Sequence, residues 1–257
     1  MFIKKIKWDI VLFAVAGIFF LMTLYTYYEN RELKQSAENV RLRVEKLFDG
    51  QTNIKAQDNE EYTSPYKELF DANKDMIAWI SIPETNIDYP VMHTPSDEQF
   101  YLHRNFFGEE DKNGTLFLDR RCNINDNEDN LIIHGHHMKS GAMFGSLPKF
   151  LNEEYKNKHS QIYLYTRDEE RVYEIIACFT SKLYRQDSEG FKYYEYIDLN
   201  SAEQLEAFNE GIKQLNKYST TPDFKQGDEF ITLSTCSYHT KNGRLAVVAR
   251  IKNKKFK

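Results

Sequence analysis

Eight short segments rich in β-branched and aromatic residues occupy most of the chain after residue 76. Turn-forming pairs such as Asn113-Gly114 and Asn242-Gly243 separate them. Regular helical patterns do not alternate with these segments, so a barrel or a sandwich is favoured over a parallel α/β sheet. The sequence therefore predicts a mainly β fold, with strands at residues 77–82, 87–92, 114–118, 130–134, 161–166, 172–179, 229–233 and 245–251.

Three further segments have helical patterns. Apolar residues recur at helical spacing between residues 31 and 48, which predicts an amphipathic helix that either packs on the domain or forms a stalk. Ser64 followed by Pro65 predicts the start of a short helix that ends near Asn73. A longer helix is expected at residues 201–218, because Leu205, Phe208, Ile212 and Leu215 share one face.

The N-terminus contains an apolar run at residues 10–24, with Trp8 before it and Tyr28 among the tyrosines that follow. Residues 8–28 are long enough to cross the hydrocarbon core as a helix, and aromatic residues are typical of both membrane interfaces. Lysines at positions 4, 5 and 7 favour a cytoplasmic N-terminus. A cleaved signal is the alternative, but only bulky residues occupy the expected cleavage region. Both interpretations export the rest of the chain.

These patterns predict four parts of the chain: a cytoplasmic tail at 1–7, a transmembrane signal-anchor at 8–28, a helical stalk and polar linker at 29–63, and one domain at 64–257. The net charge of −5 and the isoelectric point near 5.9 argue against nucleic acid as a partner, because phosphate binding requires a concentrated basic surface.

The chain has three cysteines and no Cys-x-x-Cys pair, which excludes a zinc ribbon, a thioredoxin-like motif and a disulfide framework. Cys178 lies inside an apolar strand and is expected to be buried. Cys122 lies in a polar loop and is expected to be incidental. Cys236 ends an expected strand and precedes a polar turn, so it is either an exposed nucleophile or a small buried side chain.

A cysteine nucleophile reacts as the thiolate, which requires a nearby base or positive charge. If residues 237–243 form a hairpin loop, Arg244 of the next strand faces Cys236 and can stabilise an oxyanion. A solvated surface arginine is the alternative.

Several histidines are candidates for the base. His134 and His136 would share one face of a strand, which is also compatible with zinc if His239 supplied a third ligand. His239 is itself a candidate base, three residues from the thiol. Regularly spaced acidic or cysteine ligands that would strengthen the zinc interpretation are lacking, so both assignments stay open at this point.

Thr-Leu-Ser-Thr-Cys at 232–236, Arg244 in the following strand and Gly-His-x-Met at 135–138 together resemble the sortase family. The order His, Cys, Arg agrees with that family. Asp88-Tyr89-Pro90-Val91, followed by Gly-Thr-Leu-Phe-Leu-Asp at 114–119, resembles class B sortases in particular. The similarity extends over about residues 64–251.

The resemblance implies an eight-stranded sortase β-barrel with N-terminal helices and one helix inserted before the cysteine strand. It implies Cys236 as nucleophile, His136 as acid and base, and Arg244 as the group that holds substrate and oxyanion. Ser234 and Thr235 border the nucleophile and are candidate substrate contacts. His134, His137 and His239 receive no catalytic role, and neither a metal nor a cofactor is implied.

The resemblance also implies an activity. A membrane-anchored enzyme would cleave an Asn-Pro-x-Thr-like sorting signal after Thr, form a thioester and transfer the Thr carbonyl to an amine of a cell-wall (peptidoglycan) precursor. Its partners would be exported surface proteins that carry the signal, the precursor amine and the membrane. Two alternatives remain at this point: an exported cysteine peptidase that only hydrolyses, and a catalytically inactive anchored binding barrel.

Overall fold

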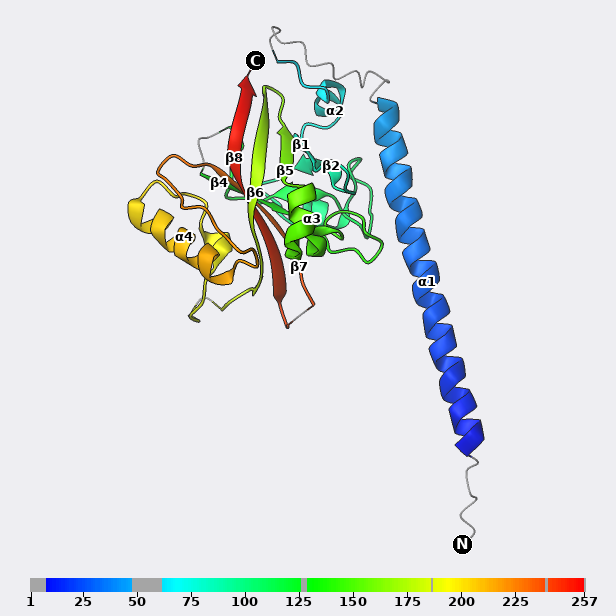
Figure 1. Ribbon diagram of the computed structural model, residues 1–257. Helices are drawn as coiled ribbons and strands as arrows, with labels where there is room; N and C mark the ends of the chain where they lie inside the picture. Colours follow the sequence, from blue (N-terminus) through cyan, green and yellow to red (C-terminus); the bar gives the residue numbers. More distant parts are fainter. Residues whose placement is uncertain (1–7, 48–61, 126–128, 186, 239, 257) are drawn as a thin grey trace.

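The computed structural model describes residues 8–47, 62–125, 129–185, 187–238 and 240–256. Eight strands close into a barrel in the order β1-β2-β3-β4-β7-β8-β6-β5, and β5 pairs with β1 to complete the ring (Figure 1). This confirms the expected mainly β fold and decides between a barrel and a sandwich. The strands are β1 (Met76–Ser81), β2 (Asp88–Met92), β3 (Leu116–Leu118), β4 (Asn130–His134), β5 (Gln161–Tyr165), β6 (Glu169–Lys182), β7 (Phe230–Cys236) and β8 (Gly243–Phe256).

Helices connect and flank these strands. The α-helices are α1 (Trp8–Leu47), α2 (Lys67–Ala72), α3 (Glu153–Lys158) and α4 (Ala202–Leu215), and the 3-10 helices are η1 (Phe100–His103), η2 (Leu147–Leu151) and η3 (Tyr193–Glu195). The helix α4 lies in the long connection between β6 and β7, as expected for the element inserted before the cysteine strand (Figure 1). The helix α3 was not expected from the sequence.

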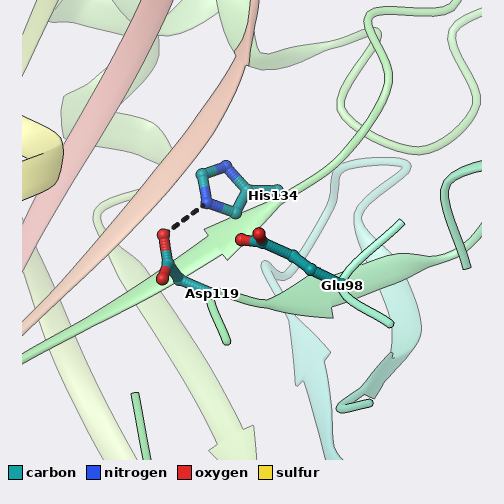
Figure 2. A group of neighbouring side chains, drawn as sticks. All are labelled: Glu98, Asp119 and His134. Carbon is teal, nitrogen blue, oxygen red and sulfur yellow. Dashed lines mark hydrogen bonds and ion pairs between the residues drawn. The ribbon is translucent and has the colours of Figure 1, made fainter. Parts of the chain in front are cut away.

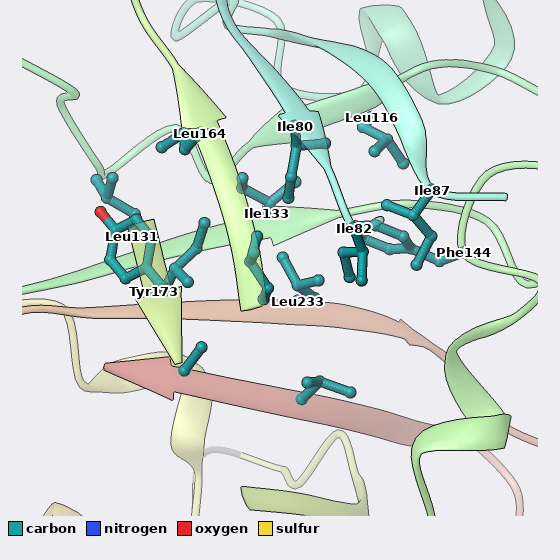
Figure 3. Packing of buried hydrophobic residues seen from close by; sticks show 14 of the residues in the cluster. Ile80, Ile82, Ile87, Leu116, Leu131, Ile133, Phe144, Leu164, Tyr173 and Leu233 are labelled. Atoms are coloured by element: carbon teal, nitrogen blue, oxygen red, sulfur yellow. The ribbon is translucent and has the colours of Figure 1, made fainter. Parts of the chain in front are cut away.

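The barrel interior is filled by apolar side chains that alternate along the strands. Ile80, Ile133 and Leu233 come from β1, β4 and β7 and are each at most 1% exposed (Figure 3). A second apolar cluster lies outside the barrel, where Phe208 and Ile212 of α4 pack over residues of β6 and β8. This packing explains why α4 forms, since its apolar residues recur on one face and the Ser201 side chain caps its first turn.

The expected apolar span and amphipathic helix form one continuous helix, α1. Its N-terminal part is exposed and is long and apolar enough to cross a membrane. Its C-terminal part packs against the barrel, where Val44 is 4% exposed and belongs to an apolar cluster with Trp79 and Phe106. The segment after residue 29 is therefore a docked helix as far as Leu47. The tail at 1–7 and most of the expected linker lie outside the described residues.

The predicted helix start at Ser64 is wrong. The helix α2 begins at Lys67, because Ser64 closes a separate turn: its carbonyl accepts from Lys67 N at 3.3 Å and its Oγ accepts from Tyr66 N at 3.4 Å. The helix ends at Ala72 with Asn73 as its C-cap, as expected.

Candidate active site

Cys236 and Arg244 face each other where the antiparallel strands β7 and β8 meet their connecting loop. The two residues are register partners, and Arg244 Nη1 donates a hydrogen bond to Cys236 Sγ at 3.4 Å. Cys236 is the exposed cysteine of the three. The expected hairpin between these strands is present, and it brings the guanidinium to the thiol.

The same guanidinium is fixed by the loop itself. Arg244 Nη1 also donates to the Gly243 carbonyl at 3.0 Å, and Ser237 N donates to that carbonyl at 2.9 Å. A backbone bond from Leu183 N to the Asn242 carbonyl at 2.9 Å ties the loop to the end of β6. The guanidinium beside the sulfur is therefore held by the Gly243 carbonyl, in a loop that is itself tied to β6. His239, the alternative base, lies outside the described residues.

The parallel pairing of β4 with β7 carries the chain at His136 toward the end of β7, where Cys236 lies. The register sets His134 beside Ser234, and two further bonds continue the contact past the end of β4: Gly135 N donates to the Ser234 carbonyl at 3.2 Å, and Thr235 Oγ1 donates to the Gly135 carbonyl at 2.7 Å. One more step of this register brings His136 beside Cys236. Neighbouring strands are about 4.8 Å apart, so the two side chains belong to one site.

The ring of His136 is half-buried and has one fixed partner. Its Nε2 donates to the Leu102 carbonyl at 2.7 Å, since a carbonyl only accepts. Burial lowers the pKa of His136 below the usual histidine range. The bond to Leu102 opposes this shift, and the nearby His103, whose ring centroid is 5.7 Å away, adds to it. Neutral His136 therefore carries its proton on Nε2, and its Nδ1 is unprotonated.

Ser234 and Thr235 are both 2% exposed. The hydroxyl of Ser234 shares a hydrogen bond with the Tyr193 hydroxyl at 2.7 Å, and Thr235 bonds to Gly135. Neither side chain is open to a substrate in this structure. Their contacts instead hold β7 to its neighbours directly before the nucleophile.

Among the described residues, the group that could hold a cation does not include His136. Glu98, Asp119 and His134 bring one ligand atom each to within 4.8 Å of one another (Figure 2). However, Arg121 donates to both Asp119 oxygens at 2.9 Å, and His134 Nε2 lies 3.2 Å from one of them.

Burial raises the pKa of Asp119, but the bonds from Arg121 and His134 outweigh it and hold the pKa well below its usual range. The negative charge is thus already paired within the protein. Of the histidines in the zinc interpretation, His134 contacts Asp119 and His136 contacts Leu102, while His239 lies outside the described residues.

The remaining candidate residues have structural positions. Cys178 is fully buried as expected, and burial raises the pKa of its thiol to about 12. Cys122, expected to be incidental, is 1% exposed and packs in the barrel core. The His137 ring lies 5.3 Å from that of Tyr238. Sequence reasoning missed the Leu102 carbonyl, because a backbone group has no residue-type signal.

Comparisons with known proteins agree with the fold and with the family resemblance. A sortase domain family matches residues 80–252. Sortase B of Listeria monocytogenes is 29% identical over 198 residues, which is 76% of this chain and 77% of that protein.

Two solved structures are also similar. Sortase B from Bacillus anthracis has a TM-score of 0.65 at 30% identity and covers 89% of this chain and 98% of its own. Sortase B from Clostridium perfringens has a TM-score of 0.63 at 30% identity, with 73% and 99% covered. Sortases are cysteine transpeptidases. The chain belongs to the sortase family, as a class B sortase.

Proposed function

We propose that this protein is a membrane-anchored sortase that cleaves an Asn-Pro-x-Thr-like signal in exported surface proteins and joins the Thr carbonyl to an amine of a cell-wall precursor. The observation that carries the proposal is the contact between Arg244 Nη1 and the exposed Cys236 Sγ at 3.4 Å. A guanidinium beside sulfur favours negative charge on the attacking thiolate and on the oxygen that develops from the Thr carbonyl.

The reaction has two stages. The Cys236 thiolate attacks the Thr carbonyl, and the carbonyl oxygen gains negative charge beside Arg244. As the C–N bond breaks, His136 gives a proton to the leaving amine nitrogen and a thioester remains on Cys236. In the second stage, neutral His136 takes a proton from the incoming amine, which attacks the thioester and regenerates the Cys236 thiolate.

The position of α1 supports an anchored enzyme. Its exposed apolar part serves as the signal-anchor at residues 8–28, with residues 1–7 in the cytoplasm. Residues 29–63 join the anchor to a catalytic domain at 64–257 outside the cell. Both the sorting-signal protein and a lipid-linked acceptor are found at that membrane face, which explains why the enzyme is tethered there.

The test uses the detergent-solubilised full chain and fluorogenic peptides with Asn-Pro-x-Thr-like or altered signals, each with and without an added amine. We expect cleavage to be faster with amine and an acyl-enzyme to be detected by mass spectrometry on Cys236. Cys236→Ala should abolish both. Arg244→Gln should lower kcat/KM by roughly 100-fold or more, and Arg244→Lys by less, because one oxyanion donor contributes about that much. His136→Ala should lower kcat/KM by roughly 100-fold or more.

The alternatives give different results. A hydrolase would release product at the same rate with and without amine. An inactive binding barrel would keep its physiological activity in Cys236→Ala. Full activity of His136→Ala would contradict the assignment of the base.

A further inference from the structure

The catalytic-site histidine is held by a carbonyl, and that carbonyl is placed by a glycine. Leu102 lies in η1, and its carbonyl accepts the bond from His136 Nε2 at 2.7 Å. Any group that moves η1 away from β4 would break this bond. The packing around η1 therefore determines how the His136 ring is oriented.

Gly114 lies directly against η1. A Cβ built on Gly114 would be 2.4 Å from the Leu102 carbonyl oxygen and 2.9 Å from the Tyr101 carbonyl oxygen. Both distances are too short for any side chain, and the φ of +61° is itself one that side chains rarely adopt. The next residue continues the contact, since Thr115 N donates to the Tyr101 carbonyl at 2.9 Å. The absence of a side chain at residue 114 lets η1 approach this closely.

The other side of η1 is fixed by Tyr101. This side chain is 1% exposed, and its hydroxyl donates to Asp75 Oδ2 at 2.9 Å and accepts from Asn73 Nδ2 at 3.0 Å. The short helix η1 is thus held on one side by the buried Tyr101 side chain and on the other by its close contact with Gly114. It cannot withdraw to make room for a larger residue without breaking these contacts.

We propose that Gly114 is a positioning residue that holds the Leu102 carbonyl against His136 Nε2, so that Nδ1 is the nitrogen that exchanges protons during catalysis. When both nitrogens carry protons, Nε2–H stays bonded to Leu102 and the Nδ1 proton goes to the leaving amine nitrogen as its C–N bond breaks. The free Nδ1 then accepts the proton of the incoming amine. The inference rests on the proposed function for the role of His136, but not for its tautomer.

Other titratable groups near the ring are His103 from η1, Cys236 from β7 and Arg244 from β8. None of them is bonded to Nε2, whose described partner is Leu102. A substitution that shifts only η1 should therefore change the tautomer of His136 and leave the Cys236–Arg244 contact in place.

The test compares Gly114→Ala with Gly108→Ala in the full chain in detergent. Gly108 also has a positive φ, of +75°, but a Cβ there meets nothing within 4 Å. The two variants share the backbone strain and differ only in the contact with η1. In Gly114→Ala we expect kcat to fall roughly ten-fold or more with KM changed by about two-fold at most, whereas Gly108→Ala retains wild-type kcat. Equal losses in both variants would overturn the proposal.

Nitrogen NMR of histidine-labelled protein reads the tautomer directly, with the His136 signals identified from their loss in His136→Gln. The wild type should have the proton on Nε2, and Gly114→Ala should show a mixture of tautomers. A wild-type proton on Nδ1 would overturn the proposal. If Gly114→Ala does not fold, Tyr101→Phe replaces it. That variant should give a smaller kcat loss and a smaller tautomer change, and an unchanged tautomer would contradict the proposal.

The two proposals fail separately. If His136→Ala were fully active, the catalytic role would be wrong whatever the tautomer. If the wild-type tautomer were Nδ1–H while His136→Ala was inactive, the role would stand and the positioning by Gly114 would be wrong.

Discussion

The three thiols of this protein have different chemistry because their surroundings differ. Cys178 is fully buried, and the raised pKa of about 12 keeps it protonated. Cys122 is buried beside the Asn130 carbonyl, which its sulfur approaches to 3.7 Å. Cys236 alone of the three is open to solvent and bonded to a cation. Access and charge together favour Cys236 as the nucleophile of the proposed function.

Two partly buried histidines should make stability depend on pH. Burial lowers the pKa of both His93 and His136 in the folded protein. As pH falls below about 6.5, the ordinary histidine value, the unfolded state binds more protons than the folded state. The free energy of unfolding should therefore decrease as pH falls below 6.5. Above pH 6.5, where both histidines are neutral in either state, the protein should have its full stability.

The measurement is urea unfolding of the full chain in detergent between pH 5 and 8. His93→Gln and His136→Gln should each flatten the pH dependence. His159→Gln, at the end of α3, removes a histidine without touching either ring and serves as the control. An unchanged slope in both of the first two variants would contradict the assignment.

The sequence could identify the site only in part at the residue scale. Cys236 and Arg244 are eight residues apart, so a hairpin was enough to predict their contact. His136 lies a hundred residues earlier and joins them through the parallel pairing of β4 with β7. Local patterns do not reveal such long-range pairing, and only the family resemblance selected this histidine. The burial of Cys122 could not be predicted for the same reason, because its polar neighbours in sequence do not report contacts made across the barrel.

At the scale of elements, all eight strands were predicted, but both ends were correct only for β4. The strands β6 and β8 are 14 residues long and pair over nearly their whole length, well beyond the apolar segments that signalled them. Once a strand is paired, backbone hydrogen bonds extend it into polar sequence. The helix α3 was missed because it has only six residues and none of them is buried.

The docking of α1 on the barrel should depend on apolar contact more than on its ion pairs. Val44 is 4% exposed, so Val44→Ala should weaken docking by about 1.5 kcal/mol, the transfer free energy of two buried methyl groups. Arg43 and Glu109 form a bidentate pair at 2.6 and 2.9 Å, but both side chains are about half exposed. Their pair should contribute little to docking, because solvent screens exposed charges.

Hydrogen exchange of the amides between residues 36 and 47 measures this docking. Exchange should be faster in Val44→Ala than in Arg43→Ala. Leu42→Ala is the matched control, because Leu42 lies on the same helix and is 44% exposed. Equal protection in Val44→Ala and Leu42→Ala would mean that the apolar contact does not hold the helix.

At the scale of the whole molecule, one helix leads from the apolar stretch directly to the barrel (Figure 1). Contacts begin soon after the apolar part ends: Asn113 Nδ2 donates to the Leu33 carbonyl at 3.1 Å, and Ser36 Oγ donates to Asp111 Oδ2 at 2.7 Å. The sequence predicted both helical segments but not their fusion, since neither pattern reports whether the residues between them stay helical. A continuous helix fixes the position and orientation of the barrel relative to the apolar stretch of α1.

This rigidity predicts different outcomes for two insertions of equal length after Tyr28. Four alanines continue the helix, adding about 6 Å and a rotation of about 40°, whereas four glycines break it. Both variants should cleave a short soluble peptide at the wild-type rate, because the barrel and its site are unchanged. With a membrane-tethered surface protein as substrate in vesicles, both variants should join less product to the amine than wild type does.

The two insertions should lose activity for different reasons. The alanine variant holds the site in a shifted but fixed position, so its loss should depend on the length of the linker between signal and membrane in the substrate. The glycine variant lets the barrel move, so its loss should be similar for all linker lengths. If neither insertion altered transfer in vesicles, the helix would act only as a tether, and the contacts of Leu33 and Ser36 with the barrel would serve stability alone.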